Sequence, residues 1–405
     1  MATVKVSKNN LFFIFIVFGY IFGVMLYDFI EFKYTDELMA SFLVLFAGLI
    51  ILERQDWKQA IPLYIIGTIF IFYIFYSFII KSNVTIAILK DSIIQMKPFL
   101  GFYCTYLLMP SLTKDHKKFI TIMCLVSALF IIIIGLTGQM FAFFGHQSRF
   151  ATAATITAFL YFYCSSYSWN NLLMFYAIFA VGLISTRSKF YGFYILAILF
   201  CSLIKSGYRL KFSLSGILMI IIILTLIISV SWGKIYYYFI FGTMESGETW
   251  ARPALFFTSF FIFIDYFPFG SGLASFATYE SAEHYSSIYT KYKINHLFGL
   301  SKEYPNFICD TYYPSLAQFG IIGMILFIYF WILIVRKINT YKNVIGISKE
   351  YIISILIICF FIIESIADST FTHNRGLFML IILGMSMSDM HLKSNEVMIE
   401  KRYNG

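Results

Sequence analysis

Long apolar runs, each about 15 to 25 residues and separated by short polar turns, recur along most of this 405-residue chain. Runs of this length suit membrane-crossing helices, whereas a membrane β-barrel shows alternating segments of about ten residues. Lipid offers the backbone no hydrogen-bond partners, and a helix satisfies its own. Hydrophobic residues make up 60% of the chain and charged residues 13%, against about 25% charged residues in soluble domains. The sequence therefore predicts an all-α polytopic membrane protein.

The apolar runs predict about 12 transmembrane helices. Their ranges are 10–30, 37–52, 60–80, 94–112, 119–141, 150–167, 172–184, 190–204, 214–230, 315–335, 351–366 and 377–387. A polar, alternating stretch at 81–95 predicts an interfacial helix before the fourth span. The chain accordingly divides into nine helices with short loops (1–230), one long loop with short helices (231–314), and three helices with a basic tail (315–405).

Lysine and arginine are more frequent in every second short turn, beginning with the N-terminal segment. By the positive-inside rule, both termini are predicted to be cytoplasmic and the long loop to lie on the outer side. The same rule explains the net charge of +9 without a nucleic-acid partner, because the basic residues are scattered over short turns. The first apolar run has no small-residue cleavage site after it and is interpreted as a retained span.

Four arginines fall at the ends of spans or loop helices on the predicted outer side, where the positive-inside rule disfavours them: Arg149, Arg187, Arg252 and Arg375. A guanidinium binds phosphate oxygens in a bidentate manner and stays charged, so one interpretation is a site for a phosphate-bearing ligand. Snorkelling toward lipid headgroups is the alternative. Arg252 precedes Pro253 at a predicted helix start, and Arg149 likewise opens a span. Helix N-termini favour anions, so a diphosphate could be held between these two starts.

Carboxylates near the same end are a second group of candidates. Glu364 and Asp368 lie at the outer end of a predicted span. A carboxylate buried among helices is costly and is therefore a functional candidate, although a structural pair with Arg375 or Lys189 is an equal alternative.

The stretch 268–272 contains two glycines, Gly270 and Gly272, which permit a sharp turn and a close approach of ligand. An ordinary loop turn is the alternative interpretation. Four histidines on the predicted outer side lack the i, i+4 spacing of a helical metal site, so no metal is expected: His146, His284, His296 and His373. Five of the six cysteines fall within apolar runs and no CxxC spacing occurs, so neither a disulfide framework nor a zinc site is expected.

The order of these motifs resembles the O-antigen polymerase and ligase superfamily, and most closely the Wzy-type polymerases of bacterial O-antigen or capsule. Arg149 and Phe150 head a span, and the Ser-Thr-Arg-Ser stretch 185–188 ends the next upward span. Arg252 then leads a helix to the stretch 265–276, and 310–323 runs into another span. The resemblance covers the order of spans from about residue 119 to the C-terminus.

The resemblance implies GT-C-like glycosyl transfer, without cofactor or metal, on the periplasmic face of the bacterial inner membrane. Undecaprenyl diphosphate-linked oligosaccharides would be both donor and acceptor, with membrane lipids and a chain-length regulator as further expected partners. The expected catalytic residues are Arg149 and Arg252, which match diphosphate-binding arginines of the family, and Asp310 as the first choice of general base. The expected substrate-binding residues are Arg187, Gly270, Gly272, Glu280, His296, Glu303, Tyr312 and Arg375, of which Glu280, Glu303 and His296 are also alternative bases.

Two alternatives remain open from the sequence. Ligases of the same superfamily tend to have His-Asn where this chain has Cys309 and Asp310, which favours a polymerase. A flippase for lipid-linked oligosaccharides would be a carrier, for which repeat symmetry, interrupted helices and charges in mid-span are expected. The predicted spans are largely free of charge at their centres, and the polar residues are concentrated in 231–314. Both observations favour an enzyme over a carrier.

Overall fold

The computed structural model describes residues 7–30, 32, 34–55, 57–207, 233, 236 and 250–403. Within this part of the chain the regular elements are helices, with no strand, so the all-α prediction is confirmed there. The predicted ninth span, 214–230, lies outside the described residues, as does most of the loop segment 231–249.

Seven of the described helical segments are long and apolar enough to cross a membrane. They are Lys8–Met25, Thr35–Arg54, Trp57–Ile80, Lys114–Leu136, Ser188–Lys205, Tyr313–Ile345 and Asn374–Lys401. Large side chains such as Leu45, Ile79 and Leu136 remain 70% or more exposed on them, as expected of surfaces that face lipid. The chain is thus a helical, membrane-embedded protein, and the count of about 12 spans stays a prediction.

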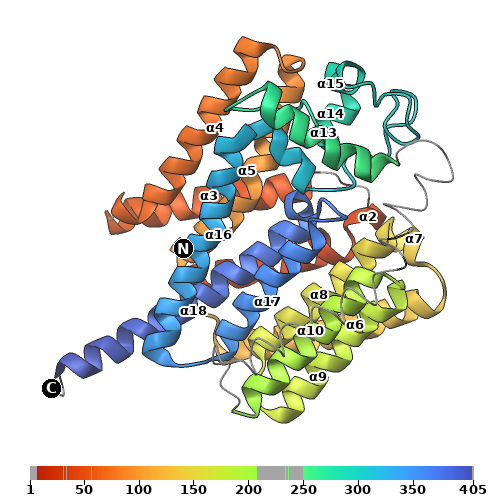
Figure 1. Cartoon of the computed structure of the whole chain (residues 1–405). Coiled ribbons are helices and arrows are strands. Elements are labelled where there is room, and N and C mark those ends of the chain that lie inside the picture. Colours follow the sequence, from red (N-terminus) through yellow and green to blue (C-terminus); the bar gives the residue numbers. More distant parts are fainter. Residues whose placement is uncertain are drawn as a thin grey trace, which may run out of the picture.

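The N-terminal part is coloured red to orange in Figure 1. Its elements are α1 (Lys8–Tyr20), the π-helical turn η1 (Ile21–Met25), α2 (Tyr27–Ile30), α3 (Thr35–Arg54), the 3₁₀ turn η2 (Trp57–Ala60) and α4 (Ile61–Ile80). The hydroxyl of Ser7 accepts the N–H of Asn10 and caps α1. Pro62 lies in the first turn of α4, where a missing N–H leaves no hydrogen bond unmade.

One prediction for this region is wrong. The sequence predicts an interfacial helix at 81–95 and a separate span at 94–112, but the structure has one continuous helix, α5 (Thr85–Leu108). Three polar residues in its first half, Asp91, Ser92 and Gln95, are buried against the protein. For example, the carboxylate of Asp91 accepts the backbone N–H of Ala274 at 2.8 Å.

A second group of helices lies at the lower right of Figure 1. It comprises α6 (Lys114–Leu136), α7 (Met140–Phe144), α8 (Gln147–Cys164), α9 (Trp169–Ala180), the 3₁₀ turn η3 (Val181–Ser185) and α10 (Ser188–Lys205). Almost every residue of α8 is buried, including three threonines whose hydroxyls donate to the carbonyl four residues earlier. A helix buried all round needs no single apolar face, so α8 forms the interior of this group.

The described part of the long loop contains short helices, as predicted. They are α13 (Ala251–Asp265), α14 (Tyr279–Glu283) and α15 (Ser287–Lys291), which lie together at the top of Figure 1. Leu255, Phe276 and Tyr289 are fully buried in a small apolar core shared by these helices. Thr278 and Ser281 form a reciprocal capping box that fixes the start of α14.

The C-terminal part places its last helix at the centre of the bundle. Its elements are the 3₁₀ turn η5 (Tyr313–Phe319), α16 (Gly320–Ile345), α17 (Lys349–Glu364), the 3₁₀ turn η6 (Thr370–Thr372) and α18 (Asn374–Tyr403). α18 contacts α5, α8, α16 and α17, and Leu377 and Phe378 near its start are completely buried. The predicted span 377–387 is too short, because the helix continues through the predicted basic tail (Figure 1).

Candidate functional site

All four candidate arginines lie at helix starts. Arg149 is the third residue of α8, Arg252 the second of α13 and Arg375 the second of α18, while Arg187 is the N-cap residue of α10. The positive end of the helix dipole makes a basic side chain unfavourable at such a position and an anion favourable. The structure supplies carboxylates to several of these arginines.

Arg252 and Asp310, expected to act as a phosphate ligand and a general base, form an ion pair with each other. Nε and Nη2 of Arg252 both donate to Oδ2 of Asp310, with Nε at 2.8 Å. The two side chains are 21% and 27% exposed. Helix α13 begins at Ala251, so Pro253 is its third residue and not its first, a shift within the first turn. The pair joins the start of α13 to the segment that precedes η5.

Arg149 and Arg375 share one carboxylate, that of Asp28 in α2. Nη1 of Arg149 lies 2.6 Å from Oδ1, and Nη2 of Arg375 lies 2.8 Å from Oδ2. Arg375 also donates to the carbonyl of Val24 at 2.9 Å, and its side chain is only 3% exposed. The side chain of Arg149 is 43% exposed. Arg375 therefore ties α18 to the N-terminal helices, whereas Arg149 is accessible.

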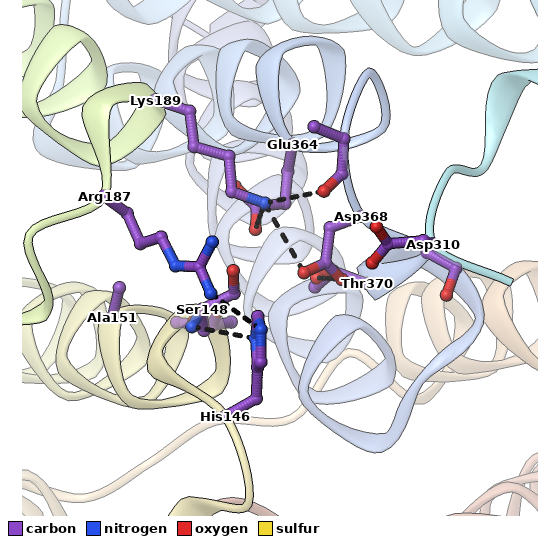
Figure 2. Close-up of polar contacts among 12 residues, drawn as sticks. His146, Ser148, Ala151, Arg187, Lys189, Asp310, Glu364, Asp368 and Thr370 are labelled. Atoms are coloured by element: carbon purple, nitrogen blue, oxygen red, sulfur yellow. Dashed lines mark hydrogen bonds and ion pairs between the residues drawn. The ribbon is translucent and has the colours of Figure 1, made fainter. Parts of the chain in front are cut away.

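Lys189 lies between the two carboxylates at the end of α17 (Figure 2). Its Nζ is 2.7 Å from Oε1 of Glu364 and 3.4 Å from Oδ2 of Asp368. The hydroxyl of Thr370 donates to the other oxygen of Asp368 at 2.7 Å. The sequence left the partner of these carboxylates open between Arg375 and Lys189, and the structure gives them Lys189.

Arg187 contacts an imidazole instead of a carboxylate. Its Nη2 lies 2.6 Å from Nε2 of His146, and the backbone N–H of Ser148 points at the other ring nitrogen (Figure 2). Burial, and then the charge of Arg187, lower the pKa of His146 to about 4. The ring is therefore neutral at pH 7, and within the described part of the chain no carboxylate forms an ion pair with Arg187.

These groups lie close enough for their charges to act on one another and are here called the charge cluster. It holds five basic and four acidic side chains: Arg149, Arg187, Lys189, Arg252, Arg375, Asp28, Asp310, Glu364 and Asp368. Figure 2 shows Asp310 beside Asp368, and the charges of both carboxylates and of Arg149 act on Cys309. The hydroxyl of Ser369 donates to the carbonyl of Cys309 at 2.7 Å and so joins the segments that carry the two carboxylates. The charge cluster therefore has one more basic side chain than acidic side chains.

The charge cluster is closely packed in this state. The enclosed space beside it measures about 10 Å³ and is lined by Arg187, Lys189 and Glu364 together with apolar residues. That volume holds about one water molecule. A phosphate or sugar therefore does not fit into this space in the present state.

The two carboxyl groups that face each other differ in proton affinity. Burial and the neighbouring Asp368 raise the pKa of Asp310, against the opposing effect of Arg252. Burial alone would raise the pKa of Asp368 as well, but Lys189 and the hydrogen bond from Thr370 hold it below its usual range. Asp310 is therefore the better proton acceptor of the two.

The two glycines of the predicted ligand-binding turn serve to pack the backbone. Both have φ of +83°, as the turn interpretation predicts. A Cβ on Gly270 would collide with the backbone at Gly320, and a Cβ on Gly272 would meet the side chain of Ser82. The close approach that glycine permits here is thus to the protein itself, which joins the loop to η5 and α4.

Four other predicted residues lie outside the charge cluster. Glu280 is buried in α14 beside His284, with Nδ1 of the ring 3.3 Å from the carboxylate. His296 and Glu303 are exposed between α15 and η5 and form no ion pair within the described residues. Tyr312 is buried, its ring 4.9 Å from that of Phe371. Glu280, His296 and Glu303 therefore remain weaker candidates for the base than Asp310.

Sequence reasoning missed Asp28, the central position of Lys189 and a partly buried triad. Lys97 in α5 is 2% exposed and pairs with Asp36 and with Glu37, the latter at 2.9 Å. Lys97 lies near the start of the predicted span 94–112, and α5 is not among the seven helical segments long and apolar enough to cross a membrane. The signal was present, since an ionisable residue in an apolar run is a functional candidate by default.

Among the described residues, no group of three or more His, Cys, Asp and Glu side chains has the geometry of a metal site. No family model matches the chain, and no significant match is found among curated proteins. Membership of the polymerase and ligase superfamily therefore stays a prediction.

Proposed function

We propose that this protein is a membrane-embedded polysaccharide polymerase that joins lipid diphosphate-linked oligosaccharide repeat units of O-antigen or capsule. The observation that carries the proposal is the Arg252–Asp310 pair within a cluster of basic side chains at helix starts. A diphosphate leaving group needs fixed positive charge, and an attacking sugar hydroxyl needs a proton acceptor. The pair brings both kinds of group together.

In the proposed reaction, the hydroxyl at the non-reducing end of one lipid-linked repeat attacks the anomeric carbon of the growing chain. The new glycosidic bond forms as the bond from that carbon to the lipid diphosphate breaks, and the bonding electrons leave with the diphosphate. Asp310 accepts the hydroxyl proton, and its raised pKa favours this transfer. Arg149 and Arg252 stabilise the charge that develops on the diphosphate.

The closed charge cluster explains how such a site could stay stable without substrate. Arg149 is paired with Asp28, which it shares with Arg375, and Arg252 is paired with Asp310. A bound diphosphate would take over both arginines as their new anionic partner. Asp310 would then be released from Arg252, which raises its basicity further when the substrate is in place.

The gel profile of surface polysaccharide from a strain that lacks the gene tests this function. A single repeat unit on the lipid core is the result expected of a lost polymerase. Core alone would contradict the proposal, because it is the profile of a lost ligase or flippase.

A second candidate is a carrier of lipid-linked oligosaccharide, which one observation favours. The partly buried triad of Lys97, Asp36 and Glu37 joins α3 to α5, and carriers use such intramembrane charges in their pathways. Lys97→Met with Asp36→Asn and Glu37→Gln removes the charges together. Normal polymer in this triple variant would assign the triad to structure, whereas loss of translocated repeats would support the carrier.

A further inference from the structure

An apolar groove lies between α1 and α3, and its lining includes Tyr27, the chain neighbour of Asp28 in the charge cluster. Its volume is about 600 Å³, and its lining includes Phe15 and Met39 as a floor, with Phe18 and Leu38 on the sides. The floor residues are less than 10% exposed, whereas the side residues are more than half exposed. The groove is therefore open along its length, and its lining is almost entirely apolar.

The groove runs along α1 and α3, and its lining becomes polar near α2. On α1 and η1 the lining extends from Leu11 to Phe22, about 17 Å at 1.5 Å per residue. This is close to half of a hydrocarbon core of about 30 Å, the depth of one leaflet. Near α2 the lining includes Tyr27, and the next residue, Asp28, forms the ion pair with Arg149.

We infer that this groove binds the hydrocarbon chain of a lipid whose phosphate-bearing head is held by Arg149. The inference rests on the proposed function, which makes that lipid the polyprenyl diphosphate carrier of the repeat units. Charge complementarity supports the choice, because the side chain of Arg149 is 43% exposed, against 21% for Arg252 and 3% for Arg375. Chain and head would then be bound at adjoining places, one apolar and one cationic.

Asp28 occupies the position that the lipid phosphate would take. Its carboxylate bridges Arg149 and the buried Arg375, so a phosphate must compete with it for Arg149. Removing the carboxylate charge should therefore strengthen lipid binding. Only the Arg149 side of this contact is open to solvent, at 43% against 9% for Asp28. The value of an exposed pair, about 0.4 to 1 kcal/mol, corresponds to a gain of about two- to fivefold.

The test is photo-crosslinking of the purified full chain in nanodiscs with polyprenyl diphosphate as the probe. Benzoylphenylalanine at Ser41, which lines the groove, should capture the probe, and the same group at the lipid-facing Leu129 of α6 should not. Capture at Ser41 should fall at least fivefold with Arg149→Ala and rise two- to fivefold with Asp28→Asn. Phosphatidylglycerol, added as a competitor in excess, should not displace the probe.

The inference would be overturned if phosphatidylglycerol were captured as well as polyprenyl diphosphate, or if Arg149→Ala left capture unchanged. The groove would then be an ordinary lipid-facing surface. Filling the groove tests the same inference independently. With benzoylphenylalanine placed at Leu38, Ser41→Trp should reduce capture of the probe, and Leu129→Trp should leave it unchanged. No capture by a protein that still extends polymer would refute the groove alone. Capture that depends on Arg149, in a protein that makes no polymer in any assay, would refute the proposed polymerase and leave the groove standing.

Discussion

The Arg252–Asp310 pair permits a test that separates chemistry from stability. Both side chains are about a quarter exposed, so the pair lies between accessible pairs, worth about 0.2 to 1 kcal/mol, and buried pairs, whose breaking costs about 3 to 5 kcal/mol. We expect a coupling free energy of about 1 to 2 kcal/mol from a double-mutant cycle with Arg252→Ala and Asp310→Ala. Equilibrium unfolding by SDS titration measures it.

The effect on the reaction should be larger. Asp310→Asn keeps the shape and much of the hydrogen bonding but removes the proton acceptor, so the rate of chain extension should fall about 10²- to 10⁴-fold. That loss corresponds to about 3 to 5 kcal/mol in the barrier. A stability loss of about 1 to 2 kcal/mol leaves most molecules folded when total stability is about 5 to 15 kcal/mol, so the two effects can be measured apart.

The matched control reverses the pair, with Arg252→Asp and Asp310→Arg in one chain. It should recover much of the coupling free energy but not the rate, because the proton acceptor and the phosphate ligand have exchanged places. Initial rates in nanodiscs with lipid-linked repeat units, read as ladders on a gel, provide the assay. Restored chain extension in the reversed pair, or less than a tenfold loss in Asp310→Asn, would show that the pair is structural and that Asp310 is not the base.

Four further outcomes follow from the same geometry. Arg149→Ala should abolish polymer at unchanged membrane levels and Arg149→Lys should restore it only in part, because an ammonium cannot make bidentate phosphate contacts; full activity of the lysine variant would indicate snorkelling. Lys189→Met leaves two carboxylates without their cation and should lower the free energy of unfolding by about 3 kcal/mol, whereas Lys189→Arg should lower it by less; SDS titration of both decides. Burial, and then Arg149, lower the pKa of His373 to about 4 against a usual 6.5, so the unfolded chain binds the proton more tightly. Stability should therefore be complete above about pH 6.5 and fall toward pH 4, and His373→Gln should flatten that slope. A phosphatase fused near Thr290 should be active and one fused near Arg402 inactive, and the reverse pattern would contradict the predicted topology.

The fold class could be predicted from local information. Apolar runs of membrane-spanning length predict helices, because a helix satisfies its own backbone hydrogen bonds in lipid. Capping residues such as Ser7 and Thr278 indicate where helices begin. Arg149, Arg187 and Arg252 all belong to the charge cluster. This agrees with the predicted alternation of spans, which places the three arginines on the same side of the membrane.

Partner choice depends on which ends meet in space, and no spacing along the chain encodes it. Arg375 pairs with Asp28, which is far away in sequence, and leaves the nearby Glu364 and Asp368 to Lys189. The same reason explains the misjudged stretch at 81–95: polarity alone indicated an interfacial helix, but protein partners make a polar helix stable in the interior.

The turn at Gly270 and Gly272 shows most clearly which features follow from local sequence and which from tertiary packing. That Gly270 and Gly272 can adopt positive φ follows from the sequence, because glycine has no Cβ and reaches this region without steric cost. What fills the space that the missing side chains leave depends on the packing of the fold, since the backbone at Gly320 comes from another element and lies there through long-range contacts. Local backbone preference is a property of the residue, whereas the neighbour it meets is a property of the whole fold.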